Sequence, residues 1–173
     1  QKLAKDENFK IGICWNGNSH GGNPVGECFS GRRSIDLKSL NPLSQIKGVS
    51  FYSLQKINSI ADIDSGDENF IIHHFGPDFD KKNGPFFDTA ALIMCMDLVI
   101  SIDTSVAHLA AGLGAKTWIC IPCAPEWRWL LDGEDAPWYA NGRLFRQNKP
   151  RDWKSAIQKM KFELEQCIKQ KKG

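Results

Sequence analysis

The sequence has no hydrophobic run long enough to cross a membrane and almost no excess charge of either sign. Its longest apolar run, Ala90–Met96, ends at Asp97, whereas a bilayer span needs roughly 20 apolar residues. The formal net charge is only +2, which gives no field that would attract nucleic acid or a membrane surface. We therefore expect neither a membrane span nor a nucleic-acid partner. The length of 173 residues and the hydrophobic share of 42% suit one domain with its own core.

Signs of secretion and of a disulfide framework are also missing. The first residues, Gln1–Asp6, are polar and contain neither an apolar leader nor a Met, so we expect a piece of a longer chain that is not secreted. Most of the 6 cysteines lie inside apolar stretches, where cysteine behaves as a small buried hydrophobic residue. The Cys-x-x-Cys pair, Cys120 and Cys123, has no second ligand pair at short spacing. We expect reduced thiols, a cytoplasmic location and no metal.

The sequence does contain a regular alternation of strand-length apolar runs and stretches with helical spacing. This alternation predicts an α/β fold, namely a Rossmann-like, doubly wound parallel sheet of about six strands in the order 3-2-1-4-5-6. Near-continuous apolar runs are typical of strands that helices cover on both faces. The predicted strands are Lys10–Trp15, Val49–Leu54, Phe70–His73, Leu98–Ile102, Thr117–Ile121 and Arg143–Arg146. The predicted helices are Asp36–Ile46, Phe86–Met96, Val106–Leu113 and Asp152–Lys171, all within a single domain over residues 1–173.

In a sheet with this strand order, ligands bind at the carboxyl ends of the strands, where the order reverses. The reversal falls between the first and the fourth strands. The loops after Trp15 and after Ile102 are therefore expected to face each other across one crevice.

The clearest candidate site is the segment Ser101–Ala111, in which a strand ends and a helix begins at once. Either Asp103 or Thr104 can cap this helix. The free amides of its first turn, the helix dipole and the hydroxyls of Thr104 and Ser105 predict a phosphate site. His108 lies one turn further on, where it can touch the same anion or hold Asp103. The alternative is structural, with a capping aspartate and a core histidine.

Three further groups of residues are predicted to border the crevice. Gly17 and Asn18, in the glycine-rich loop after the first strand, would let a ligand approach the backbone, unless that loop is only a flexible connection. Arg33 could clamp a phosphate or simply pair with Asp36. Gln55, after the second strand, could reach a ribose or a phosphate, or form an exposed turn.

A tryptophan-rich stretch, Pro125–Tyr139, follows the fifth strand. Its interleaved Trp and Arg side chains could form a platform on which a base or a sugar stacks. The alternative is a loop packed down by its own aromatic side chains. We favour that alternative for Trp127 and Trp138, and both interpretations stay open for Arg128 and Trp129.

Six motifs occur in a characteristic order along the chain. They are Ile11-Gly-Ile-Cys-Trp-Asn-Gly-Asn18, Arg33-Ser-Ile35, Phe51-Tyr-Ser-Leu-Gln-Lys56, Asp88-Thr-Ala-Ala-Leu-Ile93, Asp97-Leu-Val-Ile-Ser-Ile-Asp-Thr-Ser-Val-Ala-His-Leu-Ala110 and Trp127-Arg-Trp-Leu-Leu131. Together they resemble the C-terminal half of the heptosyltransferase-like glycosyltransferases (family 9, GT-B architecture). The resemblance is strongest to the version that follows tetratricopeptide repeats in bacterial proteins, and it extends from about Lys10 to about Lys169.

The resemblance implies two Rossmann-like halves with the active site between them, the C-terminal half holding a nucleotide-diphosphate sugar. It implies neither a metal nor another cofactor, and it assigns no catalytic residue here, because the N-terminal half usually supplies the base. Heptosyltransferases commonly have Gly at the position of Ser105, so the resemblance does not specify heptose. By position, Asp103, Thr104 and Ser105 would meet the diphosphate with His108 behind them, Gly17 and Asn18 would line its other side, Arg33 would neutralise phosphate, and Gln55 would face the nucleoside.

These expectations favour the donor-binding domain of a glycosyltransferase, with an N-terminal half or tetratricopeptide repeats as its partners in the parent protein. We expect weak or no sugar transfer by these residues alone. One alternative is a non-catalytic nucleotide-binding or scaffold domain of a tetratricopeptide-repeat protein. A second is an NAD-type oxidoreductase. The absence of a Gly-x-Gly-x-x-Gly motif, and Gln55 in place of an acidic residue, count against that second alternative.

Overall fold

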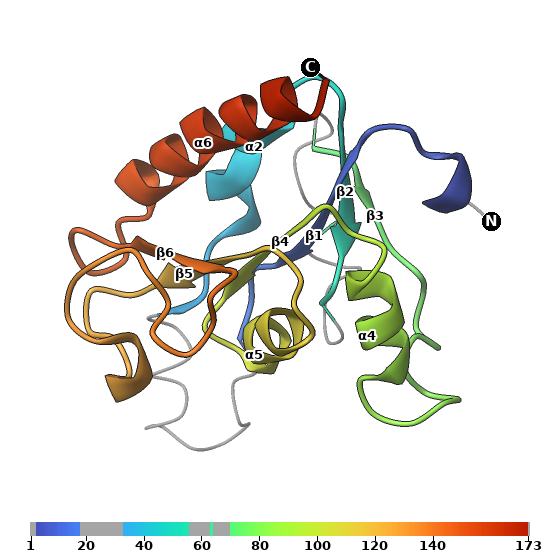
Figure 1. Cartoon of the computed structure of the whole chain (residues 1–173), viewed down its shortest axis with the longest axis horizontal. Helices are drawn as coiled ribbons and strands as arrows, with labels where there is room; N and C mark the ends of the chain where they lie inside the picture. The colour runs from blue at the N-terminus through green and yellow to red at the C-terminus, as the bar shows by residue number, and fades with distance from the viewer. Residues whose placement is uncertain (1–2, 18–32, 56–62, 64–69, 173) are drawn as a thin grey trace.

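A computed structural model describes residues 3–17, 33–55, 63 and 70–172. Its centre is one sheet of six strands in the order β3-β2-β1-β4-β5-β6, and every neighbouring pair is parallel. The strands are β1 (Phe9–Cys14), β2 (Val49–Ser53), β3 (Ile72–His73), β4 (Leu98–Ile102), β5 (Thr117–Ile121) and β6 (Gly142–Arg146). The predicted Rossmann-like α/β fold and its strand order are confirmed (Figure 1).

The strand boundaries follow the burial of the side chains. Both β4 and β5 are buried at every position and begin and end where their apolar runs predict. By contrast, β3 lies at the edge of the sheet and is only two residues long, with Ile72 buried and His73 exposed. The predicted third strand, Phe70–His73, is therefore two residues longer than the strand in the structure.

Helices cover the sheet on both faces (Figure 1). The 3₁₀ turn η2 (Leu37–Leu40), α2 (Asn41–Ser44) and α6 (Lys154–Lys172) pack on one face, and α4 (Phe87–Ile93) and α5 (Ser105–Gly112) pack on the other. Successive residues of β1 serve the two faces, since Ile11 and Ile13 contribute to the first core and Cys14 to the second. This is the alternation expected of a strand buried on both sides.

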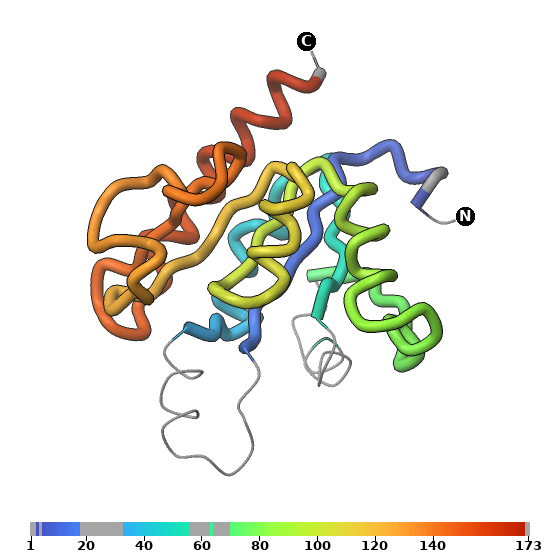
Figure 2. Tube along the Cα trace, turned by 60° about the horizontal axis from the view of Figure 1, so that its bottom comes forward, coloured from blue at the N-terminus to red at the C-terminus, as the bar shows by residue number. Residues whose placement is uncertain are grey.

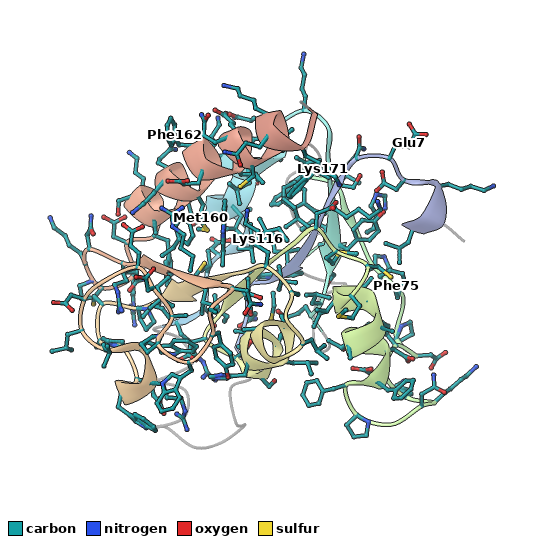
Figure 3. All side chains as sticks on the ribbon, viewed as in Figure 1. Glu7, Phe75, Lys116, Met160, Phe162 and Lys171 are labelled. Atoms are coloured by element: carbon teal, nitrogen blue, oxygen red, sulfur yellow. The ribbon has the colours of Figure 1, made fainter. Side chains whose placement is uncertain are left out.

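The C-terminal helix α6 is amphipathic, as its sequence spacing predicts. Met160 and Leu164 are fully buried against the sheet, whereas Phe162 between them is 60% exposed. Figure 3 shows Met160 on the inner side of α6 and Phe162 on its outer side. Asp152 accepts a hydrogen bond at 3.0 Å from the amide of Lys154, the first residue of α6.

The predicted helices at Asp36–Ile46 and at Phe86–Met96 are shorter in the structure. The first divides into η2 and α2, with Pro42 in the first turn of α2. The second is α4, and the residue at its cap position, Phe86, supplies no side-chain hydrogen bond. Buried Asp80 accepts from the amides of Asp88 and Thr89 instead. Among the residues that the structure describes, no helix combines the length and apolar character needed to cross a bilayer.

Candidate functional site

The carboxyl ends of β1 and β4 lie side by side at the centre of the sheet (Figure 2). Cys14 is paired with Ser101 in register, and the Cys14 sulfur lies 3.8 Å from the hydroxyl oxygen of Thr104. Complete burial raises the pKa of the Cys14 thiol, and bonds to Thr104 and Ser101 together with the positive charge of Arg33 offset part of that rise. The ends of the two strands whose loops the sequence predicts to face each other therefore lie next to each other.

Helix α5 begins directly after β4. Thr104 has extended backbone geometry, with φ −145° and ψ 172°, and its carbonyl accepts from the amides of Ala107 at 3.0 Å and His108 at 3.4 Å. Thr104 is thus the capping residue by position. Its carbonyl starts the helix, and its side chain remains available for other partners.

The amides of the first turn of α5 are not capped by a side chain. The Thr104 hydroxyl instead lies 3.2 Å from the Ser101 hydroxyl and donates to the carbonyl of Ile102 at 3.3 Å. The first turn of a helix has N–H groups without partners inside the helix, and the helix dipole is positive there. The first residue of α5, Ser105, is exposed. The start of this helix therefore offers N–H and hydroxyl donors of the kind that bind an anion.

His108, one turn into α5, has its ring fixed by three neighbours. Its Nδ1 lies 2.9 Å from the hydroxyl of Tyr139, its Nε2 lies 3.8 Å from a carboxylate oxygen of Asp103, and its ring stacks on Trp129 with centroids 5.2 Å apart. His108 packs on a core residue, as the structural alternative predicts, and it also faces Asp103. The capping aspartate of that alternative is wrong, because Thr104 occupies the cap position. Tyr139 is a site residue that sequence reasoning missed, because no short spacing connects it to His108.

Arg33 and Gly17 lie against each other at the end of β1. A Cβ atom at Gly17 would lie 2.7 Å from Nε of Arg33. The absence of a side chain at Gly17 therefore leaves room for the Arg33 guanidinium. The Nε of Arg33 is buried and has no hydrogen-bond partner among the residues that the structure describes. A buried guanidinium nitrogen without an acceptor costs free energy, which an incoming anion would recover.

Gln55 supports the same loop from the opposite side. Its amide oxygen accepts from the backbone N–H of Asn16 at 3.0 Å, and its amide nitrogen donates to the Asn16 carbonyl at 2.9 Å. The Gln55 side chain therefore forms two hydrogen bonds with the backbone of Asn16, one as donor and one as acceptor, as a residue of a neighbouring strand would. It positions the residues that precede Gly17, a role the sequence did not suggest. Asn18, also predicted to line the crevice, lies outside the described residues.

The tryptophan-rich stretch has buried and exposed members, and their distribution differs from the prediction. Trp129, in the 3₁₀ turn η3 (Trp127–Trp129), is fully buried and cannot act as a platform. Trp127 and Trp138 are exposed instead of packed down. Arg128 pairs with Glu126, whose hydrogen bond is the main reason for the raised pKa of Arg128, while Asp103 adds a smaller electrostatic contribution. This loop therefore lies within electrostatic reach of the start of α5.

Within the described part of the chain, no three His, Cys, Asp or Glu side chains cluster as metal ligands would. Cys120 is buried against Met160, and Cys123 is exposed. Comparison with known proteins gives no further assignment. No protein-family model, curated protein or solved structure matches this chain.

Proposed function

We propose that this domain binds the nucleotide-diphosphate-sugar donor of a glycosyltransferase, with the diphosphate at the start of α5. The observation that carries the proposal is that two groups near the carboxyl ends of β1 and β4 have no hydrogen-bond partner among the described residues. One is the first turn of α5, which no side chain caps, and the other is the buried Nε of Arg33, which lies against Gly17. The resemblance to heptosyltransferase-like enzymes supports the same ligand.

The roles of the individual residues follow from their positions. The amides after Thr104 and the hydroxyl of Ser105 would donate to phosphate oxygens, and Arg33 would neutralise their charge. Gly17 would allow the diphosphate to approach the backbone. In sugar transfer these same groups would stabilise the diphosphate as a leaving group, while the acceptor and the base would come from elsewhere in the parent protein.

Calorimetric titration with UDP, GDP and ADP and with the matching nucleosides tests the proposal. We expect Arg33→Ala to weaken diphosphate binding by about 10- to 100-fold and to leave nucleoside binding almost unchanged, because a charge-assisted hydrogen bond contributes about 1.5–3 kcal/mol. Thr104→Pro should weaken the diphosphate more than Thr104→Ser, because proline cannot adopt the φ of −145° at Thr104 and would therefore displace the amides of the first turn of α5.

Equal losses for nucleoside and diphosphate in Arg33→Ala, or normal binding by Thr104→Pro, would place the ligand elsewhere. Donor binding by a longer parent chain without any sugar transfer would favour the non-catalytic alternative.

A further inference from the structure

The loop between β5 and β6 presents large apolar side chains to solvent. Trp127 is 67% exposed and Trp138 is 61% exposed, and Leu130 and Leu131 between them are exposed as well. A single exposed apolar residue is ordinary in a folded protein. Four on one loop form a surface of the kind that marks a binding site.

The two exposed tryptophans form a corner of fixed geometry. Their ring centroids lie 6.0 Å apart and their planes are at 88°. The indole N–H of Trp138 donates to the backbone carbonyl of Arg128 at 3.1 Å, which ties the second ring to the turn that carries the first. We call this pair the tryptophan corner.

Arg146, at the end of β6, holds the loop that carries the tryptophan corner. Its guanidinium donates to the backbone carbonyls of Leu130 at 3.2 Å, Asp132 at 2.9 Å and Gly133 at 2.7 Å, and also to that of Trp129. Burial among these carbonyls lowers the pKa of Arg146. Ordering a loop before a ligand arrives removes an entropic cost from binding.

The backbone of the same loop is strained at one position. Leu130 has φ 59° and ψ −177°, a combination that residues with a side chain rarely adopt. The strain persists because buried Trp129 on one side and the Arg146 hydrogen bonds on the other fix the chain. Backbone strain of this kind is concentrated at functional sites.

We propose that the tryptophan corner binds a pyranose ring, with Glu126 and Arg128 bonding its hydroxyl groups. The two rings are perpendicular and so form no slot between parallel faces into which a flat base could insert, and the Arg128 guanidinium lies 4.8 Å from the centroid of the Trp127 ring. A sugar needs only one open aromatic face for its C–H groups. Glu126 and Arg128 supply the acceptors and donors that its hydroxyls require.

The corner lies next to the candidate phosphate site. Trp129, in the same turn as Trp127, stacks on His108 of α5 with an interplanar angle of 19°. A sugar held at the corner would therefore lie beside a diphosphate held at the helix start. The inference deepens the proposed function. Sugar binding at the corner stands without it, but the assignment of that sugar to a nucleotide-sugar donor rests on the proposed function.

The test uses the whole 173-residue chain labelled with ¹⁵N. It is titrated with the methyl glycosides of glucose, galactose, mannose, rhamnose and N-acetylglucosamine, and separately with UDP, GDP and ADP. We expect a glycoside to shift the indole N–H signals of Trp127 and Trp138 and not that of buried Trp118. Trp127→Ala should lower glycoside affinity about tenfold, and Trp127→Phe should lower it less. Phe162→Ala, on the outer side of α6, is the matched control and should bind as the unchanged chain does.

The proposal is overturned if none of the glycosides shifts these signals or if Trp127→Ala binds them normally. It is also overturned if the signals shift with protein concentration and no glycoside reverses that shift, because the corner would then be a contact between copies of the chain. Glycoside binding without nucleotide binding would contradict the proposed function and leave the tryptophan corner intact. Nucleotide binding without glycoside binding would overturn the tryptophan-corner proposal and leave the proposed function standing.

Discussion

Behind the candidate phosphate site, the imidazole ring of His108 contacts Asp103, Tyr139 and Trp129. Asp103 lies near Nε2 of His108, so a proton on Nε2 is electrostatically favoured, and Nδ1 is left to accept from the Tyr139 hydroxyl at 2.9 Å. The stacked indole of Trp129 prevents the ring from tilting. Tyr139 thereby acts as a positioning residue that directs the Nε2 side of His108 toward Asp103.

We expect Tyr139→Phe to release this constraint without unfolding the domain. Loss of the hydrogen bond should cost about 1 kcal/mol of stability, measured by urea denaturation. The ¹⁵N shifts of the His108 ring should move toward a mixture of tautomers. Trp138→Phe leaves the contacts of His108 in place and serves as the control. Unchanged ring shifts in Tyr139→Phe would mean that Asp103 alone sets the tautomer.

At the scale of the element, α4 depends on a carboxylate outside the helix. Asp80 accepts from the amide of Asp88 at 2.8 Å, the amide of Thr89 at 3.0 Å and the Thr89 hydroxyl, and its own amide donates to Asp88 at 3.0 Å. Asp80 also has φ 62°, a left-handed conformation that Asp and Asn tolerate better than most residues. One buried side chain thus satisfies the helix start and fixes the preceding turn.

Replacing Asp80 should destabilise the domain through α4. We expect Asp80→Ala to lower the free energy of unfolding by about 2–4 kcal/mol, because it leaves buried donors unpaired and strains the turn. Asp80→Asn keeps one acceptor oxygen and the tolerance for positive φ, so it should cost less. Asp78→Ala, which removes only an exposed pairing with Lys81, is the control. Similar unfolding curves for Asp80→Ala and Asp78→Ala would show that α4 is held by packing alone.

The elements that the sequence predicts best are those that burial alone determines. Strands β4 and β5 are apolar at nearly every position, so their boundaries and their central place in the sheet follow from composition and connectivity. The start of α5 follows from the short step between Ile102 and Thr104. The candidate phosphate site rests on the same local patterns.

Contacts between segments distant in sequence are what the patterns miss. Asp80 caps a helix that begins seven positions later, Gln55 pairs with the backbone of Asn16, and Arg146 binds the carbonyls of a preceding loop. In the sequence, Asp80 and Arg146 look like ordinary surface residues, and Gln55 looks like a ligand contact instead of a partner for the backbone. Only the folded chain supplies their partners, so neither composition nor periodicity could identify them.

At the scale of the whole molecule, a hydrogen bond joins the N-terminal segment to β2. The Tyr52 hydroxyl donates to Asp6 at 2.6 Å. Burial alone would raise the pKa of Asp6, but hydrogen bonds from Tyr52 and Asn8 outweigh it and hold that pKa below its ordinary value of 3.8. Burial, followed by the bond to Asp6, raises the pKa of Tyr52. The two shifts have the signs expected of a pair that stabilises the charged carboxylate.

The contribution of this pair should vary with pH in a defined direction. A carboxylate with a lowered folded pKa stabilises the fold above its unfolded pKa and loses that contribution as pH falls through the folded value. We expect Tyr52→Phe to lower Tm at pH 7 and to differ little from the unchanged chain below about pH 3. Asp6→Asn, which cannot ionise, should remove the same pH dependence. A difference in Tm that stays constant from pH 7 to pH 3 would assign the loss to packing of the ring.

The centre of the sheet joins parts of the chain that are far apart. Lys10 and Asp97, at the start of the β1–β4 pair, are 87 positions apart, and Cys14 and Thr104 at its end are 90 apart. Closing so large a loop is entropically costly, and such non-local pairings slow folding. A site built from the ends of both strands cannot form before that closure, so a nucleotide that binds there, as proposed, would recognise only chains whose two halves have already joined. The rate at which nucleotide binding recovers after dilution from denaturant would then report the rate at which β1 and β4 pair.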